Sequence, residues 1–189
     1  MKNKLKTVMR DINGAWHLRE MCKDIKDYLY NLSENPIIVE IGSYMGESTE
    51  IFAQEFPFAT ICAVDPWING YDDNDETSDA DMIDVENQFD MRIKYYKNII
   101  KIKDFSLNVD VFSDDISMIY IDGSHKYEDV KADILHWRNK IKVGGIISGH
   151  DYELNNKHNH ISGIKRAVDE ELSGFDKIYK DTSWLKYKI

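Results

Sequence analysis

Hydrophobic residues follow two patterns along the chain, short continuous runs and helical spacing. Four runs rich in β-branched residues predict buried strands over residues 37–42, 59–65, 116–122 and 144–149, and a weaker run predicts one over 99–102. Between them, apolar residues recur every three or four positions, which predicts helices over residues 16–33, 46–56, 85–97, 126–140 and 163–172. The tail, residues 175–189, alternates apolar and polar side chains, as a closing antiparallel hairpin does.

Alternating strands and helices predict an α/β fold with a mostly parallel, doubly wound sheet and helices on both faces. The chain has 189 residues, 42% of them hydrophobic and 31% charged, which suits a single domain over residues 1–189. We expect residues 1–35 to form an N-terminal helical extension and residues 36–189 to form a core that binds a cofactor. In such sheets, ligands bind beyond the carboxyl ends of the strands, so the residues that follow each strand are candidates for the site.

The chain carries no pattern typical of membrane insertion or secretion. No apolar run approaches the roughly 18–20 residues that span a bilayer, and the first residues lack the apolar stretch of a signal peptide. The two cysteines, Cys22 and Cys62, occur in no metal-binding spacing and are too few to staple a domain of this size. We therefore expect a cytoplasmic protein without a membrane partner.

The net charge of −10 comes from one acidic window between Pro66 and Met91, which contains no Lys or Arg. The window holds nine acidic residues, Asp72, Asp73, Asp75, Glu76, Asp79, Asp81, Asp84, Glu86 and Asp90. Without these nine, the chain has 25 acidic and 24 basic residues, a balance that does not favour nucleic acid as a partner. The window is interpreted as a solvated loop, with a lid over residues 69–84 as the alternative. A small-molecule substrate is the expected partner, and a homo-oligomer is left open.

Residues after the first two strands suit a nucleoside. Gly42 and Gly46 allow a tight turn before a helix, whose free N–H groups can face a ligand. Asp65 follows the second strand, 23 positions after Gly42, where a carboxylate can accept hydrogen bonds from ribose hydroxyls. Trp67 can pack on an adenine or a substrate, or belong to the core. The turn and the acid together favour a nucleoside cofactor over an ordinary loop.

Residues after the third and fourth strands suit proton transfer or a cation. Asp122 and His125 follow one strand and His150 and Asp151 the other, so adjacent strands would bring them to one rim. The alternative is that both acids cap loops or helices. The spacing of His150 with His158 and His160 hints at zinc, but no cysteine or further ligand supports it.

Five segments in this order resemble the class I S-adenosyl-L-methionine-dependent methyltransferases. They are VEIGSYMGEST, AVDPW, IYIDGSHKYEDVKADILHW, VGGIISGHDY and GIKRAVDEEL, within residues 37–172. The nearer likeness is to the small-molecule O-methyltransferase branch, which includes catechol O-methyltransferase-like and macrocin-type sugar O-methyltransferases. The resemblance implies a Rossmann-like sheet of about seven strands whose last strand is antiparallel.

The resemblance also implies roles for individual residues. The glycine motif that cradles the methionine part of the cofactor matches Glu40, Gly42, Ser43, Tyr44 and Gly46. Asp65 matches the acid that holds the ribose, with Trp67 beside it. The segment beside the adenine matches Asp104, Phe105 and Ser106.

The rim residues match the family less evenly. Asp122 matches an acid that contacts the cofactor side of the rim and that many of these enzymes use for Mg²⁺, and His125 resembles the general base of the sugar O-methyltransferases. His150 and Asp151 stand where that branch often has two acidic or amide ligands. A metal site of Asp122, His150 and Asp151 is therefore an expectation in which the histidine departs from the family, since Mg²⁺ prefers oxygen ligands.

These observations predict an S-adenosyl-L-methionine-dependent O-methyltransferase for a small hydroxylated molecule such as a sugar or sugar-bearing compound. We expect His125, Asp122 and Asp151 to be catalytic, with Mg²⁺ as an optional cofactor. A nicotinamide-dependent oxidoreductase is a second hypothesis, although G-x-G-x-x-G is absent. A protein that binds the cofactor without catalysis is the third.

Overall fold

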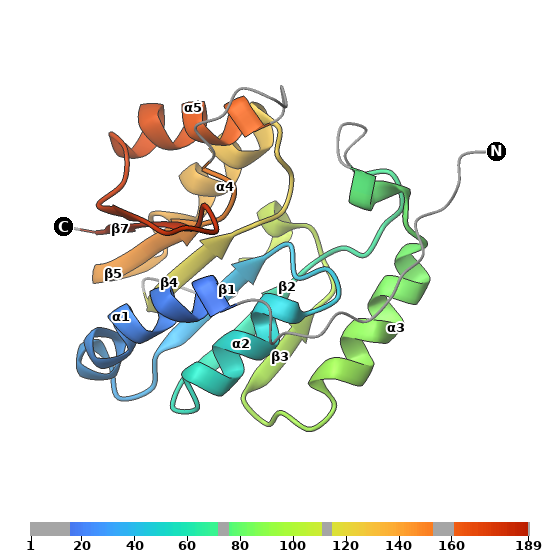
Figure 1. Ribbon diagram of the computed structural model, residues 1–189, viewed down its shortest axis with the longest axis horizontal. Helices are drawn as coiled ribbons and strands as arrows, with labels where there is room; N and C mark the ends of the chain where they lie inside the picture. The colour runs from blue at the N-terminus through green and yellow to red at the C-terminus, as the bar shows by residue number, and fades with distance from the viewer. Residues whose placement is uncertain (1–15, 72–75, 111–114, 153–160, 189) are drawn as a thin grey trace.

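The computed structural model describes residues 16–71, 76–110, 115–152 and 161–188. These residues form one sheet with helices packed against it (Figure 1). Among them, seven strands pair in the order β3-β2-β1-β4-β5-β7-β6. The strands are β1 (Ile37–Ile41), β2 (Thr60–Val64), β3 (Ile99–Ile102), β4 (Ile116–Ile121), β5 (Ile141–Gly149), β6 (Lys177–Ile178) and β7 (Trp184–Tyr187). β1 to β5 are parallel, and β7 runs antiparallel to both β5 and β6. The predicted fold class and the closing hairpin are confirmed.

Helices cover both faces of the sheet (Figure 1). They are α1 (Trp16–Leu32), α2 (Glu47–Glu55), α3 (Met82–Ile93), α4 (Tyr127–Trp137) and α5 (Ile161–Leu172), with short 3₁₀ turns η2 (Glu76–Asp79) and η3 (Ser106–Asn108). Successive strand residues point to opposite faces, so Ile38 packs with α1 and α2 while Val39 packs with α4 and α5. Ala63 packs with Phe89 of α3, which places α3 on the α1 and α2 face.

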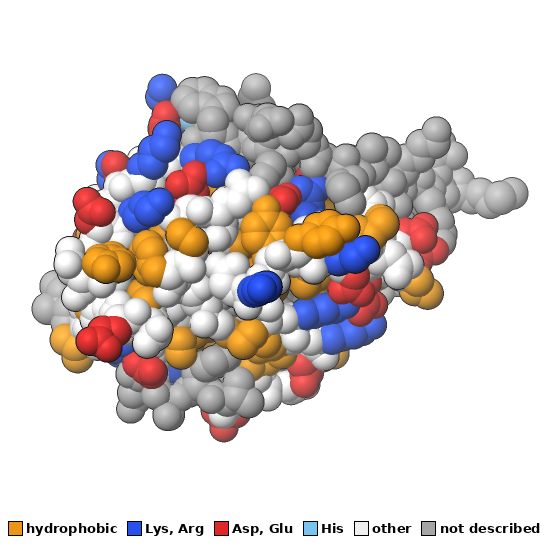
Figure 2. Space-filling model, turned by 90° about the horizontal axis from the view of Figure 1, so that it is seen from below, with side chains coloured by type: hydrophobic (Ala, Val, Ile, Leu, Met, Phe, Trp, Pro, Cys, Tyr) orange, Lys and Arg blue, Asp and Glu red, His pale blue; other side chains and the backbone are white. Residues whose placement is uncertain are grey.

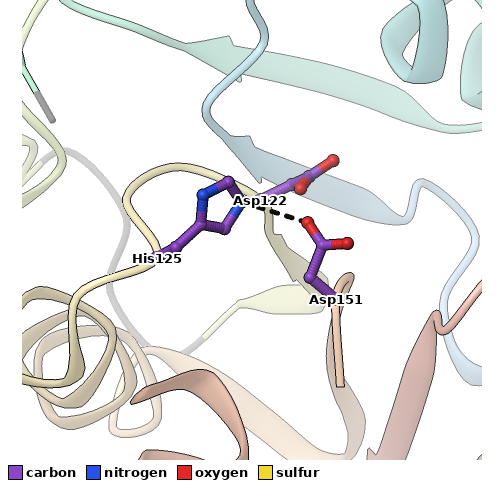
Figure 3. A group of neighbouring side chains, drawn as sticks. All are labelled: Asp122, His125 and Asp151. Atoms are coloured by element: carbon purple, nitrogen blue, oxygen red, sulfur yellow. Dashed lines mark hydrogen bonds and ion pairs between the residues drawn. The ribbon is translucent and has the colours of Figure 1, made fainter. Parts of the chain in front are cut away.

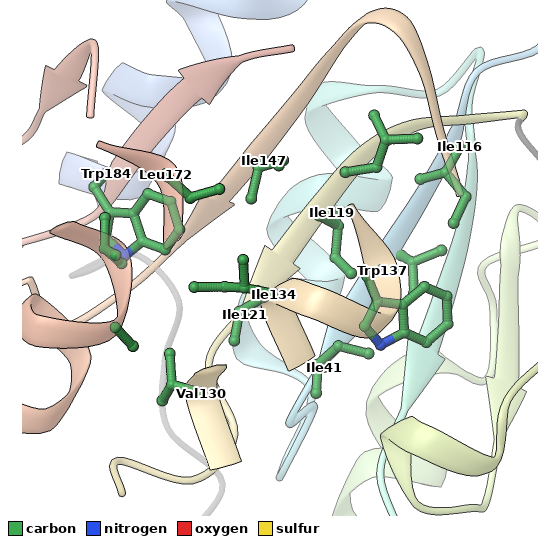
Figure 4. Packing of buried hydrophobic residues seen from close by; sticks show 14 of the residues in the cluster. Ile41, Ile116, Ile119, Ile121, Val130, Ile134, Trp137, Ile147, Leu172 and Trp184 are labelled. Atoms are coloured by element: carbon green, nitrogen blue, oxygen red, sulfur yellow. The ribbon is translucent and has the colours of Figure 1, made fainter. Parts of the chain in front are cut away.

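The core on the α4 and α5 face is built around two fully buried tryptophans, Trp137 and Trp184 (Figure 4). Val130, Ile134 and Trp137 recur at helical spacing and turn one side of α4 toward the sheet. On the other face, α1 buries Met21, Cys22, Ile25 and Leu29 completely, so the described part of the predicted N-terminal extension is packed into the core.

Two elements begin earlier than the sequence pattern predicts. β5 starts at Ile141 rather than at residue 144, because the strand continues through a bulge. On one side of the bulge Ile141 pairs with Ile116 of β4, and on the other side Ile146 pairs with Met118. Gly144, with φ of 78°, lies in that bulge and hides the strand pattern. α3 starts at Met82 rather than at residue 85, because the Asp81 side chain caps it by accepting a hydrogen bond from Ile83 N–H.

The strand order reverses between β1 and β4, so the loops after these two strands meet. Gly42 has φ of 84°, and a Cβ there would lie 2.3 Å from the Asp122 backbone oxygen. Only glycine allows this approach, which brings the first loop directly against the second.

Cys22 and Cys62 are free and buried. Burial raises the pKa of the Cys62 thiol to about 11, which leaves it protonated at neutral pH. Separately, no helix in the described ranges combines the length and the apolar character needed to cross a bilayer.

Candidate active site

Hydrogen bonds to the side chain of Glu40, a residue of β1, hold the loop after this strand in place. This carboxylate is fully buried and accepts hydrogen bonds from the Ser43 and Thr49 hydroxyls, the first at 2.8 Å. Burial raises its pKa, although the hydroxyl contacts oppose the shift. Gly46 has φ of 80° and sits against Phe89, where a Cβ would come within 2.8 Å of the ring. Glu40, Ser43 and Gly46 thus shape the loop from its sheet side, and none of the three lines the cavity of described residues that opens above it.

Asp65 joins the loops after β1 and β2. Its Oδ2 accepts a hydrogen bond from Tyr44 N–H at 2.9 Å, and its Oδ1 accepts one from Trp67 N–H at 2.7 Å. Burial raises the pKa of Asp65, and the two N–H groups oppose this by stabilising the charged form. Each carboxylate oxygen keeps a lone pair for a ligand hydroxyl.

A cavity of about 540 Å³ opens above the carboxyl ends of the strands, within the usual range for small-molecule sites. Its wall is mostly apolar, with polar groups from four loops and from α4. The lining residues are Ile41, Gly42, Tyr44, Val64, Asp65, Pro66, Tyr71, Phe105, Ser106, Leu107, Asn108, Asp122, Gly123, Ser124, Asp129, Ala132 and Asp133. The structure thus brings predicted site residues from all three cofactor segments to one cavity.

Like Glu40, Ser43 and Gly46, two further residues expected beside the cofactor do not line this cavity. Trp67 is 4% exposed and packs on Phe89, while its indole N–H donates to the Tyr44 carbonyl at 2.9 Å. Its role here is in the core. The exposed Asp104 instead accepts hydrogen bonds from Phe105 N–H and the Asn108 amide, so it shapes its own turn.

Asp122, His125, His150 and Asp151 gather at one rim, as predicted from their strands. His125 Nε2 lies 3.0 Å from Asp151 Oδ2, joining the loops after β4 and β5 (Figure 3). His150 Nδ1 lies 3.0 Å from Asp151 Oδ1 and 4.0 Å from Asp122 Oδ1. Asp122 also lines the cavity, so the rim and the cavity are continuous.

Burial and mutual contacts shift the pKa values of the rim in different directions. Burial raises the pKa of Asp122 to about 7, against the attraction of His150. Burial opposes a charge on His150, but the two neighbouring carboxylates outweigh it and raise its pKa to about 9. Burial also opposes a charge on Asp151, yet hydrogen bonds from both imidazoles hold its pKa below the usual range. At neutral pH the rim therefore contains an ionised Asp151 beside a protonated His150.

One group at the rim has the donor atoms for a cation. Single ligand atoms of Asp122, His125 and Asp151 all lie within 4.8 Å of one another. The predicted set named His150 in place of His125, although His150 contacts the same two carboxylates. His158 and His160, from the zinc hypothesis, lie outside the described residues.

Sequence reasoning missed the part of the cavity wall that α4 supplies, above all Asp133. This acid occupies one of the core-facing positions that continue from Val130 to Ile134 and Trp137, and it is 7% exposed. A carboxylate in an apolar helical stripe is the signal that identifies it.

Comparison with known proteins agrees with this arrangement. A family model described as a methyltransferase domain matches residues 39–152. The uncharacterized protein y4gI of Sinorhizobium fredii is 29% identical over 124 residues, which are 62% of this chain and 13% of that protein. The chain thus spans a small part of the length of this curated relative.

Solved structures share the fold. The O-methyltransferase NovP has a TM-score of 0.64 and 17% identity, covering 90% of this chain and 78% of its own. CalS11, a TDP-rhamnose 3′-O-methyltransferase of calicheamicin biosynthesis, has a TM-score of 0.61 and 12% identity, covering 95% and 81%. The family model matches more than half of the sequence, and its range runs from β1 through the rim, so this chain belongs to the methyltransferase domain family.

Proposed function

We propose that the protein transfers a methyl group from S-adenosyl-L-methionine to a hydroxyl oxygen of a small metabolite, in the class of sugars or sugar-bearing compounds. This proposal rests mainly on the position of Asp122, which lines the cavity and also belongs to the rim of acids and imidazoles. A ligand in the cavity would therefore lie next to groups that can accept a proton. The cytoplasm remains the expected compartment, and nucleic acid is not an expected partner.

The cavity suits the cofactor in size and in the order of its polar groups. Gly42 and Tyr44 belong to the loop expected to cradle the methionine part, and Asp65 offers two carboxylate oxygens to the ribose. Pro66, Phe105 and Leu107 supply apolar surface for a flat base. These residues support binding of an adenosyl group.

Methyl transfer is a displacement in line with the bond that breaks. The acceptor oxygen forms a bond to the methyl carbon while the carbon–sulfur bond breaks, and its electron pair stays on sulfur. The protein therefore acts mainly by positioning the acceptor and by removing its proton.

His125 and Asp151 are suited to that proton transfer. His125 Nδ1 is buried, so the ring can meet an acceptor only through Nε2, the atom that faces Asp151. At 3.0 Å the two side chains leave no room for a hydroxyl between them, so an acceptor must first displace Asp151 from Nε2. In the tautomer with hydrogen on Nδ1, the acceptor hydroxyl then gives its proton to Nε2. Asp151 then stabilises the imidazolium as a positioning residue.

A divalent cation is the second use of the same atoms. Asp122, His125 and Asp151 would hold it, and the cation would lower the pKa of the acceptor hydroxyl. The imidazole among these ligands suits transition metals better than Mg²⁺.

The acceptor class rests on resemblance and on two neighbours. NovP is an O-methyltransferase and CalS11 methylates TDP-rhamnose, but both identities to this chain lie below 20%. Tyr71, from the acidic window, lines the cavity and is one of the residues that an acceptor can meet.

Calorimetry separates the three hypotheses. We expect binding of S-adenosyl-L-homocysteine and no binding of NAD⁺, whereas the oxidoreductase hypothesis requires the reverse. An assay with methyl-labelled cofactor and a panel of sugars then tests catalysis. Tight binding of the homocysteine product without methyl transfer to any hydroxylated acceptor would favour the non-catalytic alternative.

A further inference from the structure

Asp133 is a buried acid on the side of α4 that faces the core. It follows Val130 at the spacing of the apolar stripe, yet it also lines the cavity that contains Asp65. At 7% exposure, its carboxylate has given up most of its contact with bulk water. A charge in such a position is costly unless something in the cavity interacts with it.

Only one of the two carboxylate oxygens of Asp133 has a hydrogen-bond partner among the described residues. Oδ1 accepts a hydrogen bond from the Ser106 hydroxyl at 2.5 Å, and Ser106 Oγ in turn accepts one from the Trp137 indole at 2.8 Å. Because an ionised carboxylate can only accept, the Ser106 hydroxyl donates to Asp133, and its oxygen accepts from the indole N–H. Among the described residues the carboxylate has no ion pair, and Oδ2 has no partner.

The other acids near this end of the cavity are differently engaged. Asp129 lines the cavity but is exposed and accepts a hydrogen bond from Ser124. Asp104, which the sequence places beside the adenine, is exposed and holds its own turn. Asp133 is therefore the buried acid at this end with a lone-pair-bearing oxygen left for a ligand.

The surroundings select the ligand group. Phe105 and Leu107 belong to the same loop as Ser106 and give the cavity apolar surface, which suits the faces of a flat aromatic base. An ionised carboxylate at the edge of that space accepts hydrogen bonds and cannot donate them. It therefore favours a base that carries an N–H donor at its edge.

We propose that Asp133 selects the base of the cofactor by accepting a hydrogen bond from the exocyclic amino group of adenine through Oδ2. This assignment rests on the proposed cofactor and adds a specificity-determining residue to it. Ser106 and Trp137 are positioning residues, which hold Oδ1 and so aim Oδ2 at the base. Burial raises the pKa of Asp133 to about 6, with the charge of Asp129 adding to the shift, so the acid is mostly ionised at pH 7.5.

The test compares two ligands that differ at the edge of the base. S-adenosyl-L-homocysteine carries an amino group at purine position 6, and S-inosyl-L-homocysteine carries an oxygen acceptor there. At pH 7.5, the native protein should bind the adenosyl compound roughly ten- to a hundredfold more tightly, because the inosyl oxygen faces a carboxylate oxygen. Equal affinities for the two compounds would overturn the assignment without any variant.

Asp133→Asn should change which ligand is preferred. The Ser106 hydroxyl still donates to the side-chain carbonyl oxygen, so the new amide NH₂ turns toward the cavity. There it can donate to the inosyl oxygen, but it cannot accept a hydrogen bond from the adenine amino group. We expect the adenosyl compound to bind at least about tenfold more weakly, and the inosyl compound to bind as well as before or better. Glu128→Gln, which removes a carboxylate charge from an exposed position of the same helix that does not line the cavity, should leave the ratio unchanged.

The remaining outcomes also decide the matter. If Asp133→Asn weakens both ligands by the same factor, Asp133 only ties η3 to α4 and the assignment is wrong. If the native protein binds neither compound, the proposed cofactor itself is wrong and the assignment fails with it. Binding of both compounds with equal affinity leaves the cofactor class intact and refutes the role of Asp133 alone.

Discussion

Replacing Asp65 by alanine should weaken both the fold and cofactor binding. The variant loses the acceptor for two backbone N–H groups, those of Tyr44 and Trp67, at 2.9 and 2.7 Å. Hydrogen bonds to charged groups contribute about 1.5–3 kcal/mol each. Water can replace part of this at a partly exposed site, and the cost of burying the charge is recovered. We therefore expect the free energy of unfolding to fall by about 2–4 kcal/mol.

The two readouts are independent. At about 2–4 °C per kcal/mol for a chain of this size, the melting temperature should fall by roughly 5–15 °C. Calorimetry with S-adenosyl-L-homocysteine, performed well below that temperature, should show affinity reduced at least about tenfold, because the ribose hydroxyls lose their acceptor.

Asp104→Ala is the matched control. It makes the same chemical change at an exposed acid that also holds two hydrogen-bond donors, and it should cost about 1 kcal/mol or less. If Asp65→Ala melted within about 2 °C of the native protein and bound the ligand equally well, both the loop contacts and the ribose assignment would be refuted.

Three further results are expected. His125→Ala should lower turnover about a hundredfold or more with unchanged cofactor affinity, and its melting temperature should fall slightly because Asp151 loses a hydrogen bond. His136→Ala, at a histidine that does not line the cavity, should keep its turnover, and native turnover in His125→Ala would rule out the proposed base. Gly42→Ala should lower the free energy of unfolding by more than about 2 kcal/mol in denaturant titrations, because its Cβ meets the Asp122 oxygen; a smaller loss would show that the loops can separate. Because burial raises the pKa of Asp133 to about 6, the free energy of unfolding of the native protein should fall by about 2 kcal/mol relative to that of Asp133→Asn as pH rises from 4 to 7. If the difference in free energy of unfolding between the two proteins did not depend on pH, a buried acid that ionises in this range would be contradicted.

The strands and the mostly parallel class of the sheet were predictable because their residues leave few other solutions, whereas the order of the strands was not predicted. Runs such as residues 37–42 and 116–122 are too short for helices and too apolar for loops. Where a glycine bulge interrupts the run, as at Gly144, the pattern fails although the chain remains extended. Hydrogen bonding to the neighbouring strand, which no local pattern encodes, decides that case.

The candidate site was predictable where a residue directly follows a strand, as Asp65 and Asp122 do. The candidate site was harder to predict where an aromatic residue near a strand end can either enter the core or line the cavity. Trp67 and Phe105 are both aromatic residues near a strand end, yet Trp67 packs in the core and Phe105 lines the cavity. Their side-chain directions depend on the packing of α3 and η3 and not on sequence position.

The acidic window divides in the same way. Its expected exposure does not hold throughout, because Ala80 and Met82 are buried beside Phe89. Asn69 accepts a hydrogen bond from Met82 N–H, which ties together the two ends of residues 69–82. Residues 72–75, the centre of the predicted lid, lie outside the described residues, and closure of the lid over a ligand stays a prediction.

On the face shown in Figure 2, basic side chains lie among acidic ones rather than in one continuous field.

The place of β7 in the sheet has a consequence for how the protein is made. This strand comes last in the sequence, yet it lies between β5 and β6, and Trp184 donates a hydrogen bond to the His150 carbonyl at 3.3 Å. During synthesis, β2 and β4, which precede Asp65 and Asp122, can each pair with β1 as soon as they leave the ribosome. The loop of His150 and Asp151 must wait for residues 184–187 to arrive. A nascent chain can therefore bring the loops of Asp65 and Asp122 together before the loop of His150 and Asp151 is held in place, and its core stays incomplete until Trp184 is added.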